Sequence, residues 1–98
     1  ILIHGWPLSS DSWDPVMTKL ADNGMRAIAY DRRGFGRSDH AATGYDYDTF
    51  ADDLADLIGR LGLNQNIGLA GFSMGGGEIA RYMSRHGGAG VTAAALVS

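Results

Sequence analysis

The sequence has no cysteine, only two prolines and a single lysine, Lys19, among its 98 residues. The lack of cysteine excludes a disulfide framework, a thiolate metal cluster and a cysteine nucleophile. Eight basic against eleven acidic residues give a formal charge of -3, so no basic stripe exists to neutralise phosphates, and we expect no nucleic-acid partner. The longest apolar run, residues 91–97, is far too short to span a bilayer, so we expect no membrane-embedded role for this segment.

The length and the two ends of the chain favour part of a single domain. A 98-residue chain hides roughly 60 to 65% of the surface that its unfolded form exposes, which suffices for one core but not for two. The chain opens at Ile1 inside an apolar strand pattern and closes at Ser98, where a buried strand would lead into a loop. We interpret residues 1–98 as the N-terminal half of one domain, an internal fragment of a protein that we expect in the cytoplasm. Any signal peptide would lie before Ile1.

Apolar residues recur at helical spacing in three segments. The first stripe follows candidate caps at residues 9–12 and ends before Gly24, the second starts at Asp46, Asp48 or Thr49 and ends before Gly62, and the third covers about residues 74–86. We expect three amphipathic helices, each with one apolar face. The first two apolar faces consist of Trp13, Val16, Met17 and Leu20, and of Phe50, Leu54, Leu57, Ile58 and Leu61.

Aliphatic segments between these helices predict four strands, at residues 1–3, 25–30, 67–72 and 93–97. The crossovers of about 20 to 35 residues are long enough for right-handed parallel connections, so the fold class is α/β with a parallel sheet. We expect the second strand outside the first, and the third and fourth strands on the other side of the first. Ligands of such sheets bind at the carboxyl ends of the two central strands, which carry His4-Gly5-Trp6 and Gly71-Phe72-Ser73.

The segment Gly71-Phe72-Ser73-Met74-Gly75 matches the pattern G-x-S-x-G between a predicted strand and a predicted helix. A nucleophile on so tight a turn has a strained backbone, and side chains two residues before and after it would collide, so glycine is required at both positions. Gly71 and Gly75 meet that requirement, which makes Ser73 the candidate catalytic residue. The alternative is a serine that merely caps the helix.

Two backbone N–H groups are candidate donors to an oxyanion. The N–H of Met74 opens the third helix, so the helix dipole lies behind it, and the N–H of Trp6 follows the neighbouring strand. We assign the ordering of the loop around Trp6 to His4, Gly5 and Pro7. His4 would act through a hydrogen bond, and Pro7 through its fixed backbone angle and its missing N–H. The alternative for His4-Gly5 is a turn that simply ends the strand.

The remaining histidines and Asp31 suit structural roles better than catalytic ones. His86 lies thirteen residues along the helix from Ser73, about 20 Å away at 1.5 Å per residue, and suits a favourable charge at a helix C-terminus. His40 lies in an irregular loop. Asp31 follows a strand and could orient a histidine, but Asp31-Arg32-Arg33-Gly34 is more typical of a salt-bridged turn, which we predict.

Cofactor motifs are incomplete in this sequence. The pattern G-x-G-x-x-A at residues 75–80 lacks the acidic residue, about 20 positions further on, that a dinucleotide site needs. No Walker-type phosphate loop occurs, and three scattered histidines lack metal-ligand spacing. We expect no metal and no other cofactor.

Taken together, three segments resemble the α/β-hydrolase superfamily, in order and across the whole chain: His4-Gly5-Trp6-Pro7, residues 30–38 (YDRRGFGRS) and residues 71–77 (GFSMGGG). The Trp-Pro step and the elbow more narrowly resemble the cofactor-free bacterial haloperoxidases, also called perhydrolases or aryl esterases. The resemblance implies a Ser-His-Asp enzyme in which Ser73 is the nucleophile and the N–H groups of Trp6 and Met74 form the oxyanion hole. Such enzymes hydrolyse small esters, and they convert a carboxylic acid and hydrogen peroxide into a peracid that oxidises halide, without metal or haem.

The resemblance also implies what lies outside this chain. In the family's chain order the aspartate and the histidine of the triad follow the serine, so both would lie beyond Ser98. The two leading strands and any cap domain are absent too, and we expect the chain alone to be inactive. A non-catalytic relative that binds a small ligand is the alternative, although such proteins usually lose the serine or an oxyanion donor. Dehalogenases and epoxide hydrolases would carry aspartate in place of Ser73.

Overall fold

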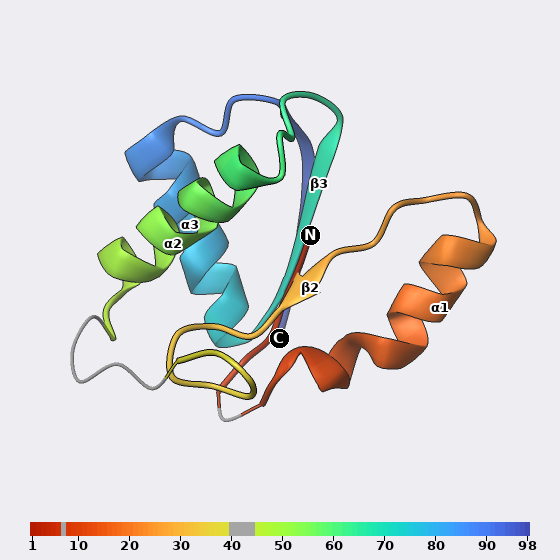
Figure 1. Ribbon diagram of the computed structural model, residues 1–98. Helices are drawn as coiled ribbons and strands as arrows, with labels where there is room; N and C mark the ends of the chain where they lie inside the picture. Colours follow the sequence, from red (N-terminus) through yellow and green to blue (C-terminus); the bar gives the residue numbers. More distant parts are fainter. Residues whose placement is uncertain (7, 40–44) are drawn as a thin grey trace.

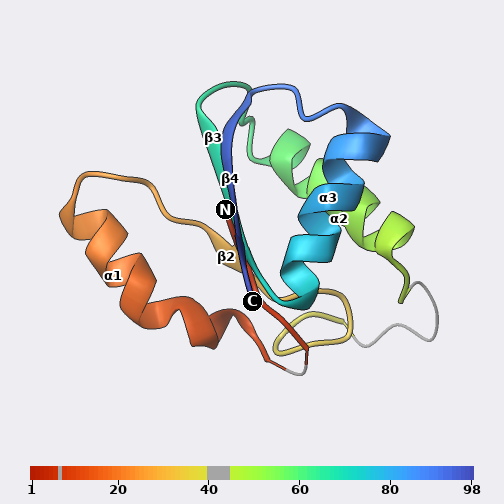
Figure 2. The ribbon, with the colours of Figure 1, turned by 180° about the vertical axis from the view of Figure 1, so that it is seen from behind.

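The computed structural model describes residues 1–6, 8–39 and 45–98. Strands and helices alternate in the order β1 (Leu2–Ile3), the 3-10 helix η1 (Ser10–Trp13), α1 (Asp14–Asp22), β2 (Ala29–Tyr30), α2 (Tyr47–Arg60), β3 (Ile67–Phe72), α3 (Met74–His86) and β4 (Val91–Val97). Helices α2 and α3 cover one face of the sheet, and α1 lies on the other (Figures 1 and 2). The alternation confirms the predicted α/β class.

The four strands form one parallel sheet in the order β2-β1-β3-β4. Leu2 lies opposite Ala29 of β2 on one side and opposite Ala70 of β3 on the other. This is the predicted strand order, and it makes β1 and β3 the two central strands. Because parallel strands end at the same edge of a sheet, the loop after Ile3 and the turn after Phe72 lie side by side.

The helix ends agree with the sequence signals. Among the three cap candidates for α2, the Asp46 carboxylate caps the helix, since it accepts a hydrogen bond from the N–H of Thr49 at 2.7 Å. Gly24, Gly62 and Gly87 follow the three α-helices with φ angles of +77°, +68° and +77°, the left-handed region that favours glycine. No helix in the described ranges has the length and apolar character to cross a bilayer.

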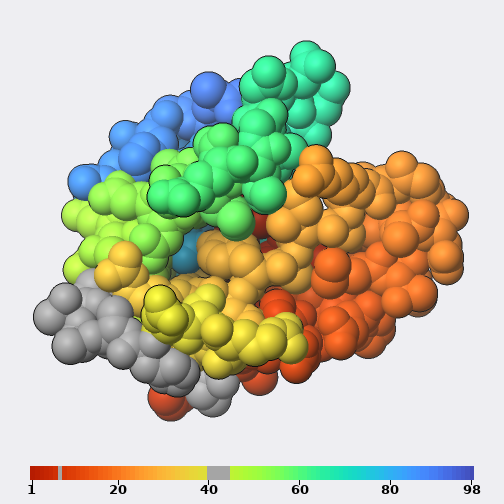
Figure 3. All heavy atoms as spheres, in the orientation of Figure 1, coloured from red at the N-terminus to blue at the C-terminus, as the bar shows by residue number. Residues whose placement is uncertain are grey.

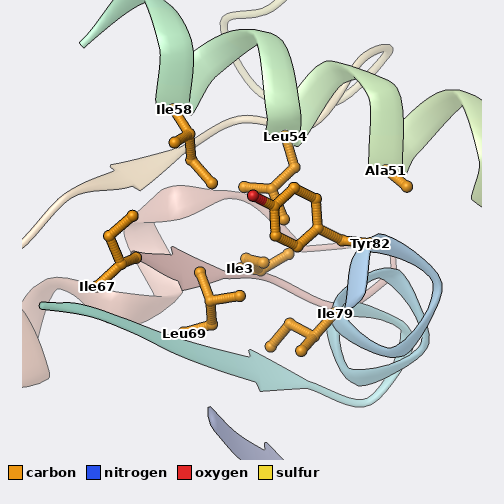
Figure 4. Packing of buried hydrophobic residues seen from close by; sticks show 8 residues of the cluster. All are labelled: Ile3, Ala51, Leu54, Ile58, Ile67, Leu69, Ile79 and Tyr82. Atoms are coloured by element: carbon orange, nitrogen blue, oxygen red, sulfur yellow. The ribbon is translucent and has the colours of Figure 1, made fainter. Parts of the chain in front are cut away.

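The hydrophobic core lies between the sheet and the pair α2 and α3 (Figure 4). Leu54 of α2 and Ile3 of β1 are completely buried there, and the side chain of Leu69 on β3 faces the same space. This core fixes α3, and hence the beginning of α3 after Ser73, against the two central strands. The buried cluster consists of Ile3, Ala51, Leu54, Ile58, Ile67, Leu69, Ile79 and Tyr82.

The apolar stripe of the first predicted helix is not buried. Ser9 caps η1, and α1 begins only at Asp14, so Trp13 precedes α1 rather than opening it. No residue of α1 is buried, and Val16 is 39% exposed. On this face of the sheet an apolar hollow is lined instead by Leu20, by the chain after α1 and by strand residues such as Ala70 and Ala95.

Two strands differ in length from the prediction. The second strand was expected over residues 25–30, but β2 contains only Ala29 and Tyr30. Within the described residues, β2 pairs with β1 at two positions, Leu2 opposite Ala29 and Ile3 opposite Tyr30. The fourth strand starts at Val91 rather than Ala93, with a register shift where Ile67 and Gly68 of β3 pair with it.

Candidate active site

Ser73 is the single residue between the end of β3 and the beginning of α3. Its φ and ψ are +54° and -111°, a conformation rarely adopted by non-glycine residues, which costs roughly 1–3 kcal/mol. Two hydrogen bonds hold this backbone: the Ser73 N–H donates to the Val97 carbonyl at 2.7 Å, and the Gly76 N–H donates to the Ser73 carbonyl at 2.9 Å. The Ser73 side chain is therefore presented on an exposed, rigid turn.

The glycines on either side of Ser73 occupy positions with no room for a side chain. A Cβ on Gly71 would lie 2.5 Å from the carbonyl carbon of Gly75. A Cβ on Gly75 would collide with the carbonyl oxygen of Ile3 in β1. Both obstacles are backbone atoms, so no rotamer change relieves them. Glycine at both positions thus lets α3 start directly against β1.

The loop after β1 lies against this turn. A Cβ added to Gly5 would meet the Phe72 carbonyl oxygen at 2.9 Å and the Ser73 Cβ at 3.2 Å, so a side chain at position 5 would push the loop away from Ser73. The Leu8 N–H donates to the Gly5 carbonyl at 2.8 Å, which closes a turn around Trp6. The Trp6 side chain is 68% exposed. Pro7, to which the sequence assigns loop ordering, lies outside the described residues.

Met74 is the first residue of α3, and its backbone N–H belongs to the free N-terminal turn of a thirteen-residue helix. The positive end of the helix dipole therefore lies at the turn that carries Ser73. The structure brings together the segments that carry both candidate oxyanion donors, at the ends of adjacent strands.

His4 is completely buried at the start of this loop. Its Nε2 accepts a hydrogen bond from the Arg32 N–H at 2.9 Å, so the ring proton resides on Nδ1, which donates to the Gly5 carbonyl at 3.1 Å. Burial, together with the nearby Arg32 charge, lowers the pKa of His4 and favours the neutral ring. Both ring nitrogens are occupied, which fits an ordering role and leaves no nitrogen for proton transfer to Ser73.

The structure places His86 far from Ser73. His86 lies at the far end of α3, where its Nε2 is 2.7 Å from the Asp52 carboxylate and its ring stacks on Tyr82. His40 lies outside the described residues. In the segments that the structure covers, no cluster of three or more histidine, aspartate or glutamate side chains is arranged to hold a metal ion.

Asp31 binds backbone N–H groups and pairs with Arg37, rather than with the adjacent arginines of the predicted salt-bridged turn. Its carboxylate accepts hydrogen bonds from the backbone N–H groups of Ser10 at 2.7 Å and Arg37 at 2.9 Å, and it lies 3.4 Å from the Arg37 Nε. Partial burial works to raise the pKa of Asp31, but these hydrogen bonds and the Arg37 charge outweigh it and lower the pKa to about 2. The neighbouring arginines point elsewhere, Arg33 to Asp53 and Arg32 into the interior.

Sequence reasoning missed a buried ion pair below the site. The Arg32 Nε lies 3.1 Å from the Glu78 carboxylate, and both side chains are 1% exposed. The Tyr30 hydroxyl donates a further hydrogen bond to Glu78. A signal existed in the sequence, because Glu78 falls on the buried stripe of α3 at helical spacing from Gly75, Ile79 and Tyr82. A charged residue on such a stripe requires a buried partner.

The chain is similar in sequence and in fold to several known proteins. The chain is 50% identical to the non-heme chloroperoxidase CPO-A1 of Kitasatospora aureofaciens over 98 residues, which is 100% of this chain and 35% of that protein. It is 45% identical over 95 residues to the bifunctional esterase/perhydrolase DCH of Acinetobacter calcoaceticus, covering 97% of this chain and 34% of that protein. The crystal structure of a bromoperoxidase from Bacillus anthracis superposes with a TM-score of 0.93 at 50% identity, over 97% of this chain and 34% of that one.

The chain spans about a third of the length of these relatives. A family model described as alpha/beta hydrolase fold matches residues 1–98, the entire sequence. The parallel strand order and the turn at Ser73 are the features that the sequence led us to expect of such a protein. With the match extending from the first residue to the last, the chain belongs to the α/β-hydrolase family.

Proposed function

We propose that this chain supplies the nucleophile and the oxyanion hole of a serine hydrolase that acts on small carboxylic esters. In this proposal Ser73 is the nucleophile, and the N–H groups of Trp6 and Met74 bind the oxyanion. The aspartate and histidine of the triad come from residues outside positions 1–98. The same site carries cofactor-free perhydrolase activity, in which a carboxylic acid and hydrogen peroxide give a peracid and water.

One observation carries the proposal: an exposed serine held at a φ of +54° by two glycines that nothing larger could replace. Strain of this kind persists only where the surrounding structure enforces it, and it concentrates at functional sites. A serine that merely capped α3 would accept a hydrogen bond from the helix with its side chain. The Ser73 side chain makes no such bond.

The chemistry follows from the placement of Ser73 at the beginning of α3. The serine oxygen attacks the ester carbonyl while its proton passes to the histidine, and the carbonyl oxygen becomes an oxyanion between the two N–H donors. The alcohol then leaves with the proton, and an acyl group remains on Ser73. Water releases this group as the carboxylic acid, whereas hydrogen peroxide releases it as the peracid. Removing a donor of this kind costs roughly 10²- to 10³-fold in kcat.

The named relatives support both halves of this activity. One is called a non-heme chloroperoxidase and another a bifunctional esterase/perhydrolase. A solved structure with a TM-score of 0.94 and 42% identity is an esterase from Exiguobacterium antarcticum. The residues of this chain serve hydrolysis and perhydrolysis alike, since the two reactions differ only in the nucleophile that attacks the acyl group.

The test uses the protein encoded by the complete source gene, which we call the whole gene product. We expect Ser73→Ala to abolish both p-nitrophenyl acetate hydrolysis and peracetic acid formation from acetate and hydrogen peroxide. Ser84→Ala, which changes an exposed serine of the same helix, serves as the control and should keep wild-type rates. A Ser73→Ala variant with wild-type activity would refute the proposal, whereas a wild-type protein without either activity would favour the non-catalytic, ligand-binding alternative.

A further inference from the structure

The mechanism above makes no use of the buried pair Arg32 and Glu78. Bringing two charges out of water costs several kcal/mol per ion, and apolar residues of similar size often serve stability equally well or better. A buried ion pair is therefore poor support for a purely stabilising role. Its placement next to the candidate site calls for another explanation.

Arg32 holds the loop that carries Trp6. Its Nη2 donates to the His4 carbonyl at 2.8 Å, and its backbone N–H donates to the His4 Nε2 at 2.9 Å. Arg32 therefore forms hydrogen bonds with both the carbonyl and the ring of His4, the residue before Gly5. The position of the Trp6 N–H depends on these two hydrogen bonds, because only Gly5 lies between it and the His4 carbonyl.

Glu78 lies on α3, the helix that carries the second candidate oxyanion donor, the N–H of Met74. It lies four residues after Met74, which is about one helical turn or 6 Å along the axis. The Arg32 Nε donates to the Glu78 Oε1, so a single guanidinium joins the first turns of α3 to the His4 carbonyl. The loop and the helix are linked through side chains that are 46 residues apart in sequence.

The guanidinium has little freedom to shift. The Tyr30 hydroxyl donates to the Oε2 of Glu78, which orients the carboxylate, and the guanidinium carbon lies 5.0 Å from the centre of the Phe50 ring and 5.9 Å from that of Phe35. A hollow lined by Arg32, Glu78 and residues of α2 opens beside the pair (Figure 3). Within the described residues the Arg32 Nη1 has no hydrogen-bond partner, so Nε and Nη2 make the protein contacts of this guanidinium.

We propose that Arg32 and Glu78 are positioning residues that fix the separation between the Trp6 N–H and the Met74 N–H, and thereby tune the oxyanion hole. This proposal rests on the function proposed above. An oxyanion hole works only when its donors lie 2.7–3.1 Å from the position of the charged oxygen. A misplacement of about 1 Å costs roughly 100-fold in rate.

The test compares Glu78→Gln and Arg32→Lys with wild type in the whole gene product. We expect kcat for p-nitrophenyl acetate to fall about 10- to 100-fold while KM stays within about twofold, because the two N–H donors stabilise the charged oxygen only in the transition state. The inhibition constant of a boronic acid that forms a tetrahedral adduct on Ser73 should rise by the same factor as kcat falls. All rates are measured well below the Tm of each variant.

Asp52→Asn is the matched control, since it removes an acid that pairs with an arginine of α3, Arg85, but does not touch the loop. It should leave kcat and the boronic acid affinity within about twofold of wild type. If Glu78→Gln and Arg32→Lys lower only the Tm, and kcat and the inhibition constant stay unchanged, the pair is structural and the proposal is wrong.

Two further variants test the proposal if Glu78→Gln does not fold and separate it from the proposed function. If Glu78→Gln does not fold, Tyr30→Phe replaces it, because it removes only the hydroxyl that orients Glu78. A several-fold loss in kcat with a matching loss of boronic acid affinity supports the proposal, and wild-type values refute it. Ser73→Ala separates the two hypotheses: if it keeps activity, the proposed function fails and this proposal fails with it, whereas an inactive Ser73→Ala beside fully active Glu78→Gln refutes the positioning role alone.

Discussion

At the scale of single residues, the geometry around Ser73 depends on what its neighbours lack. Gly71 and Gly75 face backbone atoms at distances that no Cβ tolerates, and Gly5 faces the Ser73 side chain from the adjacent loop. The strained φ of Ser73 is therefore imposed by the close approach of α3 to β1, and the serine's own side chain does not maintain it.

Replacing Gly75 tests this close approach. Gly75→Ala should lower the free energy of unfolding of the whole gene product by about 1–3 kcal/mol, since its methyl group collides with the Ile3 carbonyl. Gly76→Ala is the matched control, because its Cβ would meet Leu96 at 3.6 Å, an ordinary contact, and alanine favours a helix by about 0.5–1 kcal/mol. Urea denaturation measures both. Equal stability of the two variants would contradict the geometry.

Asp31 gives stability a defined pH dependence. Its pKa in the folded protein is lowered to about 2, below the value of about 3.9 in an unfolded chain, so the unfolded state binds more protons between these values. The stabilisation is complete above about pH 4 and disappears as the pH falls through about 2. We expect Asp31→Asn to be less stable than wild type at about pH 7, and the difference, followed by thermal unfolding, to shrink across this range. A difference that is independent of pH would rule out the carboxylate as its source.

At the scale of elements, local signals set where the helices begin and end, whereas neighbouring elements determine what they bury. The stripe of α2 is buried against α3 and the sheet, and Leu54 is completely inaccessible. In the equally regular stripe of α1 no residue is buried: Leu20 lines an open hollow and Val16 is 39% exposed. Helical spacing predicts an apolar face, but burial requires a second surface that the described residues do not provide for α1.

The cap of α2 offers a test at this scale. Asp46→Ala should lower the free energy of unfolding by about 1 kcal/mol, because the N–H of Thr49 loses its acceptor at the helix N-terminus. Asp46→Asn keeps an acceptor oxygen and should stay within about 0.5 kcal/mol of wild type. Chemical denaturation of both variants decides between the cap and a charge effect, since only the latter would make the two losses equal.

At the scale of the whole molecule, the described residues leave the β4 edge of the sheet without a neighbouring strand. In β4, which is an edge strand among the described residues, Leu96 is 64% exposed and Val97 is 47% exposed. The apolar hollow beneath α1 adds to this surface. Apolar patches of this kind typically serve as contact surfaces for other protein segments.

We predict that the 98-residue chain alone is inactive and associates in solution. It lacks partners for Ser73 among the described side chains, and its open sheet edge can pair with other chains. Hydrolysis of p-nitrophenyl acetate by the purified chain should equal that of its Ser73→Ala variant. A monodisperse chain with cooperative melting, or an activity that depends on Ser73, would show this prediction to be wrong.

The sequence by itself determined the features that follow local rules. The elbow at Ser73 requires small neighbours within a few residues, the left-handed helix ends require glycine, and the crossover lengths suit parallel strands. Asp46 was one of three cap candidates, and only the geometry of the chain selected it. The elbow, the helix ends and the parallel strands could be predicted, because each depends on residues that are close in sequence or on the lengths of the connections.

Only the tertiary structure decided which distant charges meet. Arg32 was predicted in a salt-bridged turn, but it enters the interior to meet Glu78, and Arg37 takes the place beside Asp31. A buried charge needs a partner from whichever element the fold brings near, and this proximity is a property of packing among elements that sequence spacing does not encode.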